Sequence, residues 1–282
     1  MRKIVDLHSH SLVSDGACSP IEVVENAYKN NVQVLSLTDH DSIAGILKAR
    51  EESKKYNIEF IPGIEITTLN RDGQMLHILG YNMDISNEMF QRPYTKIKKA
   101  REATMEKIIK IIEEKDNIKI DINELNRRKL DKYLSRFDIH RYIVEKGICT
   151  NSREAWNTII DPIPFEEDEI ISVNEAISMI ANTGGQAFLA HYNHKVYGLG
   201  RFCRADIETE LNYLISLGLS GIERYYPTFT KEEEAYLDYL IEKYNLKCSG
   251  GTDYHGYYRG NNDIGIGDGS FFVEYEKTFL NK

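Results

Sequence analysis

The sequence predicts an α/β protein organised as a closed or nearly closed barrel of seven strands. Short apolar runs alternate with helical stretches of about ten or more residues, which is the pattern of successive parallel β-α units. The alternation is interrupted only between residues 83 and 168, where Lys, Glu and Ile recur at helical spacing. We therefore expect a barrel from residues 1–82 and 169–282 that carries a mostly helical insert at 83–168.

The expected elements follow one another along the chain. Strands are expected at residues 3–10, 33–37, 59–64, 75–81, 186–190, 221–226 and 246–250. Helices are expected at residues 19–30, 42–56, 172–184 and 206–217 and after Thr230. The first, third and last of these helices begin with a Ser/Thr-x-x-Glu capping box, which marks a helix N-terminus.

Composition and charge argue against a membrane protein and against a protein that binds duplex nucleic acid. The 282 residues are 41% hydrophobic and 28% charged, as in ordinary soluble proteins. No apolar run approaches membrane-spanning length and the N-terminus leads directly into a strand, so we expect a cytoplasmic protein that does not bind membranes. The four cysteines form no Cys-x-x-Cys pair and are expected to be reduced thiols. A net charge of −9 argues against stable binding of duplex nucleic acid.

Histidines and carboxylates gather at the predicted strand ends. His8 and His10 are two residues apart on a strand and therefore project from the same face. Barrels of this type place active-site residues at the carboxyl ends of their strands. Residues at or just past such ends are His8, His10, Asp39, His40, Glu65, His191, Asp253 and His255, while His77 lies within a strand and Asp15 in the first loop.

Each of these residues also has an ordinary structural explanation. Asp39 could cap the following helix, Glu65 could be an edge residue, and Asp253 could shape a turn. These explanations would have to hold independently, and they do not predict a shared location. Burying so many imidazoles and carboxylates together without a cation would be costly. The sequence therefore predicts a polynuclear metal site.

Six segments resemble, in order, the motifs of the PHP family, named after polymerase and histidinol phosphatase. They are Asp6-Leu7-His8-Ser9-His10, Thr38-Asp39-His40, Gly63-Ile64-Glu65, His77-Ile78-Leu79-Gly80-Tyr81, Ala190-His191 and Gly251-Thr252-Asp253-Tyr254-His255. With Gly221-Ile222-Glu223 and the helical insert, the chain is most similar to the stand-alone nucleoside 3′,5′-bisphosphate phosphatases and 5′→3′ oligoribonucleases. The resemblance implies a distorted seven-stranded, TIM-like β/α barrel.

The resemblance also implies three divalent metal ions. The ligands would be His8, His10, Glu65 and Asp253 for the first ion, Glu65, His77 and His191 for the second, and Asp15, His40 and His255 for the third. Mixed imidazole and carboxylate ligands suit Mn, Fe or Zn. The expected reaction is hydrolysis of a phosphomonoester by a metal-bridging hydroxide. Asp39 would orient ligands, and His194, three residues after His191, is a candidate proton donor to the leaving group or an exposed loop residue.

Substrate recognition is expected from the insert. Ser135-Arg136-Phe137-Asp138 aligns with a Gly-Arg-Pro-His segment common in the subgroup, and the Arg136 guanidinium is suited to clamping a second phosphate. Arg201 and Lys195 could add phosphate contacts or be surface charges. The segment Tyr225-Tyr226-Pro227 could stack on a base or belong to the core.

The leading hypothesis is a metal-dependent phosphoesterase. Its substrate would be a small phosphorylated metabolite such as a nucleoside 3′,5′-bisphosphate, together with the 5′ ends of short oligoribonucleotides. The alternatives are a histidinol-phosphate phosphatase on the same scaffold and a non-catalytic metal-binding regulatory module.

Overall fold

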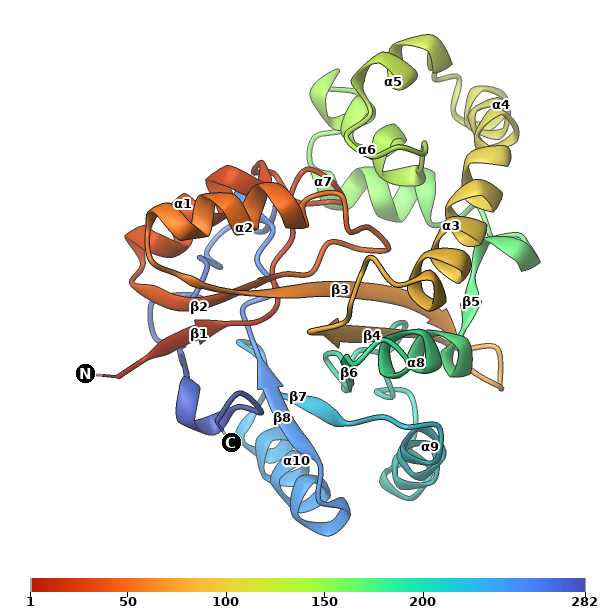
Figure 1. The fold of residues 1–282 in the computed structure, drawn as a ribbon. Coiled ribbons are helices and arrows are strands. Elements are labelled where there is room, and N and C mark those ends of the chain that lie inside the picture. Colours follow the sequence, from red (N-terminus) through yellow and green to blue (C-terminus); the bar gives the residue numbers. More distant parts are fainter. Residues whose placement is uncertain (1, 282) are drawn as a thin grey trace.

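The computed structural model describes residues 2–281, in which one sheet curls into a nearly closed barrel (Figure 1). The strands are β1 (Ile4–Asp6), β2 (Val32–Leu37), β3 (Glu59–Leu69), β4 (Met75–Tyr81), β5 (Ile171–Ser172), β6 (Gln186–Leu189), β7 (Gly221–Tyr225), β8 (Lys247–Gly250) and β9 (Val273–Glu274). Their order in the sheet is β8-β7-β6-β4-β3-β2-β1-β9, with β5 paired to β3. All seven predicted strands are present, and two-residue β5 and β9 are additional because so short a strand carries no recognisable alternation.

The gap between β8 and β1 is bridged by the chain that follows each strand. The main-chain N–H of Leu7 donates to the carbonyl of Gly250 at 3.1 Å, and Ser9 and Tyr254 form a parallel bridge. A Cβ on Gly251 would lie 2.4 Å from the main-chain N of His8, so this approach requires glycine. The closure brings the carboxyl ends of the first and last barrel strands together.

One part of the predicted topology is wrong. The alternation of strands and helices implies parallel pairs throughout, but β4 runs antiparallel to both β3 and β6. The cause is the connection from β3 to β4, which consists of Asn70–Gln74 and closes with a hydrogen bond from Asn70 N to Gln74 O. A turn this short can only reverse the chain, because a parallel pair needs a crossover of about a dozen residues.

The helices of the barrel follow the predicted capping signals. They are α1 (Pro20–Lys29), α2 (Ile46–Lys55), α8 (Val173–Ala181), α9 (Arg204–Ser216) and α10 (Lys231–Tyr244), with short 3₁₀ turns η3 (Gly256–Arg259) and η4 (Tyr275–Lys277). Complete capping boxes begin α1, α8 and α10, as the sequence predicts. The second helix starts at Ile46 rather than at residue 42, because residues 41–45 form the loop behind His40.

Three apolar cores hold the barrel. Its interior contains residues from opposite strands, among them Val5, Leu79 and Phe188. One outer core lies under α1 and α2, and another under α8, α9 and α10. The apolar side chains of the first of these cores fill most of the barrel interior. The buried polar side chains, among them His8 and Glu65, lie together at one end of the barrel. Among residues 2–281, no helix has both the length and the apolar character needed to cross a bilayer.

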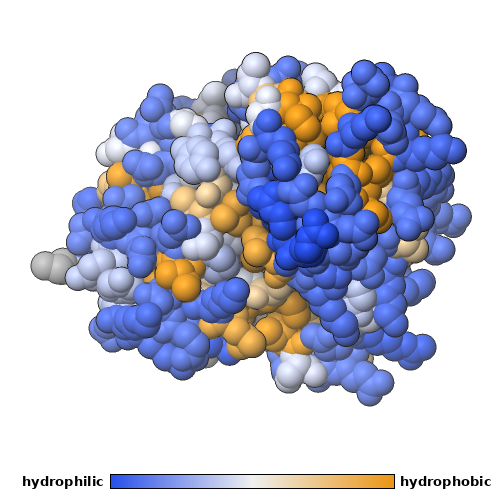
Figure 2. Space-filling view, turned by 90° about the horizontal axis from the view of Figure 1, so that it is seen from above, coloured by the Kyte–Doolittle hydropathy of each residue, from blue (hydrophilic) through white to orange (hydrophobic). Residues whose placement is uncertain are grey.

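The insert between β4 and β5 is helical, as predicted. It comprises α3 (Glu88–Ala103), α4 (Met105–Asp116), α5 (Ile122–Arg128), α6 (Arg136–Glu145), α7 (Ser152–Glu154), the π-helical turn η1 (Ala155–Ile160) and the 3₁₀ turn η2 (Glu167–Glu169). A separate apolar core between Met105 and Ile163 belongs entirely to it, whereas Phe90 of α3 packs on the barrel. In Figure 1 its yellow and green helices stand over one end of the sheet, and Figure 2 shows hydrophobic side chains gathered on its outer face among hydrophilic ones.

The insert is tied to two loops of the barrel. Arg101 of α3 pairs with Asp41 at 2.7 Å, and the Ser42 hydroxyl donates to Asp131 at 2.6 Å. Arg141 of α6 donates to the carbonyl of Leu12 at 2.6 Å. Asp41 and Ser42 directly follow His40, and Leu12 lies in the loop that carries Asp15. The insert therefore rests on the loops that follow β1 and β2.

Candidate metal centre

The nine predicted metal ligands converge at one end of the barrel. Each is at most 9% exposed, although they come from within β3 and β4 and from the chain that follows β1, β2, β6 and β8. Within residues 2–281, three groups of ligand atoms lie within 4.8 Å of one another: His8, His10, Glu65 and Asp253; His10, Asp15, His40 and His255; and His40, Glu65 and His77. The ninth residue, His191, joins them through Glu65.

Glu65 lies at the centre of the cluster. It sits in the middle of the long strand β3, and its backbone forms an isolated bridge with His40. Five imidazole nitrogens surround its two carboxylate oxygens: His8 (3.0 Å), His10 (3.1 Å) and His40 (3.2 Å) at Oε2, and His77 (2.9 Å) and His191 (3.0 Å) at Oε1. A carboxylate with different neighbours at each oxygen has the arrangement expected of a bridging ligand.

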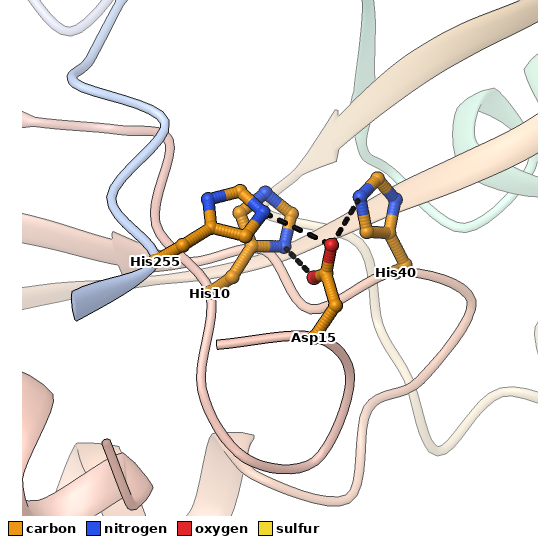
Figure 3. Close-up of side chains that lie close together, drawn as sticks. All are labelled: His10, Asp15, His40 and His255. Atoms are coloured by element: carbon orange, nitrogen blue, oxygen red, sulfur yellow. Dashed lines mark hydrogen bonds and ion pairs between the residues drawn. The ribbon is translucent and has the colours of Figure 1, made fainter. Parts of the chain in front are cut away.

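Asp15 forms the second focus of the cluster, shown in Figure 3. Its Oδ2 lies 3.1 Å from His255 Nε2 and 3.8 Å from His40 Nε2, and its Oδ1 lies 3.7 Å from His10 Nδ1. The Nδ1 of His255 lies 2.7 Å from the main-chain carbonyl of Asp253 and can donate its proton there. This contact directs the Nε2 lone pair of a neutral His255 towards Asp15.

The distances between nitrogen and oxygen atoms in the cluster match those between ligands of a shared cation. Two donors that bind one ion at about 2.1 Å and subtend about 90–110° lie about 3.0–3.4 Å apart, close to the separations around Glu65. Several of these buried nitrogens, including both of His10, Nδ1 of His40 and Nδ1 of His77, make no hydrogen bond within the described chain. His8 faces carboxylates from both ring nitrogens, although a neutral imidazole has only one proton to donate. The residues present therefore fit divalent metal ions.

The ionisation of the cluster suits cation binding. Burial alone would raise the pKa of Glu65, but the surrounding imidazoles hold it well below its ordinary value. Burial lowers the pKa of His40 and of His255 to about 4, against the pull of nearby carboxylates. His8 and His10 differ, because neighbouring carboxylates overcome their burial; they raise the pKa of His8 well above its ordinary value and that of His10 to about 9. At neutral pH the cluster thus offers ionised carboxylates and the neutral imidazoles of His40 and His255.

Backbone strain is concentrated in the same region. His191, Asp253 and Asp41 have φ values of 24°, 52° and 52°, a conformation that non-glycine residues rarely adopt. Two of them are predicted ligands and the third follows His40. Such conformations persist where surrounding contacts impose them, and they cluster at functional sites.

Glu223 is a site residue that sequence reasoning did not assign. It is fully buried in β7, where Oε1 lies 2.8 Å from His8 Nδ1 and Oε2 accepts the main-chain N–H of His191 at 2.8 Å. Its place directly after Gly221-Ile222 in a predicted buried strand was the available signal, since a buried carboxylate needs a partner. It orients two predicted ligands and is directed away from Glu65.

Asp39 acts on the loop that carries Asp15. Its carboxylate accepts hydrogen bonds from Ser11 N (2.6 Å), Ser11 Oγ (2.8 Å) and Ser14 Oγ (2.9 Å). Burial raises the pKa of Asp39 despite these bonds. Asp39 is not in any of the three groups of ligand atoms. Its contacts indicate that it holds the loop of Asp15 in place.

His194 lies on the rim of the cluster. It is exposed, its ring centroid is 5.5 Å from that of His191, and its Nδ1 accepts the N–H groups of Val196 and Tyr197. In the neutral ring the proton is therefore on Nε2. This tautomer can donate a hydrogen bond from Nε2 and leaves no lone pair there.

The structure gives Arg136 contacts other than a phosphate clamp. Its guanidinium donates to the carbonyls of Ile163 and Pro164 and lies over the ring of Phe165, so its charge is committed to holding the insert together. The neighbouring Phe137 reaches the cluster instead and stacks on His40 at 5.9 Å.

The remaining predicted substrate contacts lie on the surface or have other partners. Arg201 pairs with Asp72 at 2.5 Å, and Lys195 is exposed in the loop after His191. Tyr226 donates its hydroxyl proton to Asp253 at 2.8 Å, and its ring lies near those of His191 and Phe229.

A barrel with imidazoles and carboxylates converging at its strand ends defines a metallohydrolase. The PHP domain family matches residues 6–150, about half of the chain. A 5′-3′ exoribonuclease of Haemophilus influenzae is 32% identical over 262 residues, covering 90% of this chain and 91% of the relative. The chain belongs to the PHP domain family and is a metal-dependent phosphoric ester hydrolase.

Other relatives match over similar lengths. A phosphoribosyl 1,2-cyclic phosphate 1,2-diphosphodiesterase of Eggerthella lenta is 27% identical, covering 90% of this chain and 94% of the relative. A 3′,5′-nucleoside bisphosphate phosphatase of Chromobacterium violaceum is 24% identical, covering 93% and 90%. The fold is similar to that of a candidate metal-dependent phosphoesterase from Bifidobacterium adolescentis, with a TM-score of 0.82 at 22% identity, covering 98% of this chain and 94% of that one.

Proposed function

We propose that the cluster binds three divalent ions, each of them Mn, Fe or Zn. The ligand sets are His8, His10, Glu65 and Asp253; Glu65, His77 and His191; and Asp15, His40 and His255. The three groups of converging ligand atoms and the central position of Glu65 support this number. Bound divalent ions lower the pKa of water and neutralise phosphate charge. With three carboxylates and neutral imidazoles, the net charge is about +3, which favours an anionic ester.

The proposed substrate is a nucleoside 3′,5′-bisphosphate, from which one phosphate is hydrolysed, and the 5′ end of a short oligoribonucleotide is a second substrate. Convergence of the nine predicted ligands into one buried cluster is the observation that carries the phosphoesterase assignment. The substrate class rests on the relatives from Haemophilus influenzae and Chromobacterium violaceum, whose similarity extends over nine-tenths of the chain. An enzyme that acts on small or single-stranded substrates does not need a wide basic surface.

Two further assignments complete the proposal. Residues 83–168 form a cap that bounds the substrate site, supported by their own core and by the contacts to the loops behind His40 and Asp15. The Nε2–H of His194 donates a hydrogen bond to the leaving oxygen, supported by its tautomer and its position beside His191.

A panel of esters tests this function. Protein loaded with Mn, Fe or Zn is assayed for turnover of 3′-phosphoadenosine 5′-phosphate, 5′-phosphorylated trinucleotides, histidinol phosphate and phosphoribosyl 1,2-cyclic phosphate. The proposal expects the highest kcat/KM for the bisphosphate or the trinucleotide. Preference for histidinol phosphate or the cyclic ester overturns the substrate class, and absence of turnover on all four, with a tightly bound protein partner, favours the regulatory module.

A further inference from the structure

Asp253 presents its two oxygens to different surroundings. Oδ1 faces the imidazoles of the cluster, at 3.1 Å from His10 Nε2 and 3.4 Å from His8 Nε2. Oδ2 faces the other way and accepts hydrogen bonds from the Tyr226 hydroxyl at 2.8 Å and from Arg259 Nη1 at 2.5 Å. The carboxylate is therefore held so that Oδ1 alone is directed at the cluster.

Arg259 uses only part of its guanidinium in this contact. Its Nε and Nη2 make no hydrogen bond to residues 2–281, and its side chain is 40% exposed although Asp253 is 6% exposed. It is the last residue of η3, the 3₁₀ turn that begins directly after His255, so its guanidinium lies beside the two predicted ligands Asp253 and His255. After burial, the charge of Arg259 is the next cause that lowers the pKa of His255.

The other arginines near the site are already engaged. Arg136 is bound to carbonyls of the insert, Arg101 to Asp41, and Arg141 to Leu12 and Asp138. Arg259 is thus a cation that is fixed at one nitrogen, free at two others, and adjacent to a predicted metal ligand. A planar guanidinium with two free N–H groups matches the oxygens of a phosphate.

We propose that Arg259 binds a non-bridging oxygen of the substrate phosphate through Nε and Nη2 while Nη1 stays on Asp253. This inference rests on the proposed phosphoesterase function, since it requires a phosphate at the cluster. The contact adds a positive charge at the reacting phosphate, and Asp253 fixes the guanidinium before the substrate arrives. Arg259 therefore favours a phosphate over a neutral ester at this site.

The test measures binding of inorganic phosphate to the metal-loaded protein by calorimetry, with metal content per chain determined by elemental analysis. For Arg259→Gln we expect the wild-type metal content and a Kd for phosphate raised about tenfold or more, because a charge-assisted contact is lost. Arg259→Lys is expected to restore part of the affinity. Arg204→Gln, a surface arginine paired with Glu232, should bind phosphate like the wild type.

Tyr226→Phe separates phosphate binding from orientation of Asp253. This variant loses the other hydrogen bond to Oδ2 of Asp253 without losing a charge, so its phosphate Kd per loaded site should stay within twofold of wild type. A phosphate Kd in Arg259→Gln equal to wild type overturns the inference, as does loss of metal from that variant with unchanged affinity in the sites still loaded. Absence of phosphate binding to the loaded wild type would instead contradict the proposed function itself.

Discussion

The carboxylate of Glu223 joins two strand ends that lie far apart in the sequence. Its Oε1 lies 2.8 Å from Nδ1 of His8, and its Oε2 accepts the N–H of His191. A neutral His8 that donates from Nδ1 presents the lone pair of Nε2 to Glu65, 3.0 Å away. One buried residue therefore sets both the tautomer of a predicted ligand and the position of a second one.

Replacing Glu223 with Gln should weaken metal binding. The amide must place its NH2 group against either His8 or the His191 N–H, so one of the two contacts is lost. Partners of this kind typically contribute about 10–100-fold in metal affinity. Elemental analysis after dialysis against a weak chelator measures the effect. Glu210→Gln, which alters a buried glutamate paired with Arg71, is the control and should retain metal. Equal retention by both variants would contradict the role of Glu223.

Truncation of a predicted ligand should abolish turnover without unfolding the barrel. His8→Ala and Asp253→Ala each remove a donor from the ligand set of the first proposed ion, and the apolar interior around Val5 and Phe188 is untouched. Phosphate release measures the first effect, and circular dichroism together with the urea midpoint measures the second. Near wild-type turnover in either variant would refute the ligand assignment.

The insert should lose stability in acid through His140. This buried imidazole stacks on Trp156 at 4.9 Å, and burial lowers its pKa to about 4. A depressed folded-state pKa means that the neutral form is favoured on folding. The contribution is therefore complete above about pH 6.5 and is lost as pH falls towards 4, by up to about 3 kcal/mol.

Trp156 is the only tryptophan of the chain and reports this transition by its fluorescence. Urea unfolding of metal-free protein is followed at several pH values for wild type and His140→Gln. Any constant cost of the glutamine cancels in the pH dependence of the difference. The gap between the two proteins should change by the stated amount between pH 7 and pH 4, and parallel curves would show that His140 does not titrate in this range.

The strands and the convergence of the predicted ligand residues were predictable because local pattern encodes them. A short apolar run ending in His8-Ser9-His10 indicates both a buried strand and the end of that strand, and the capping box at Ser19 marks where α1 begins. The carboxyl-end rule for barrels then places distant strand ends together. Residues whose position is set by backbone periodicity are therefore accessible to sequence reasoning.

Side-chain partners were not predictable in the same way. Arg136 lies in the segment that resembles a family motif, but its guanidinium binds carbonyls of residues 163 and 164. The reversal of β4 depends on a connection too short for a crossover. The contacts of Glu223 and Arg259 depend on which side of each segment faces the cluster. Such contacts are decided by three-dimensional packing, which one sequence does not specify.

The ion pair between Arg101 and Asp41 should couple the insert to the metal centre. Both side chains are buried, Nη1 of Arg101 lies 2.7 Å from Oδ2 of Asp41, and Oδ1 of Asp41 accepts the N–H of Thr67. Removing one partner leaves the other charge buried and unpaired, which costs about 3–5 kcal/mol. Asp41 directly follows His40, so movement of the insert also displaces a predicted ligand. We expect Arg101→Met to be cleaved faster by limited proteolysis within residues 83–168.

The same variant should raise KM while it lowers stability. Arg92→Met, an exposed arginine of the same helix α3, controls for loss of charge and should behave like the wild type. A double-mutant cycle with Asp41→Asn isolates the pair, since each single change removes the same contact. If the two changes were additive in both stability and KM, the insert would be held by its other contacts, and the loop behind His40 would not respond to the position of the insert.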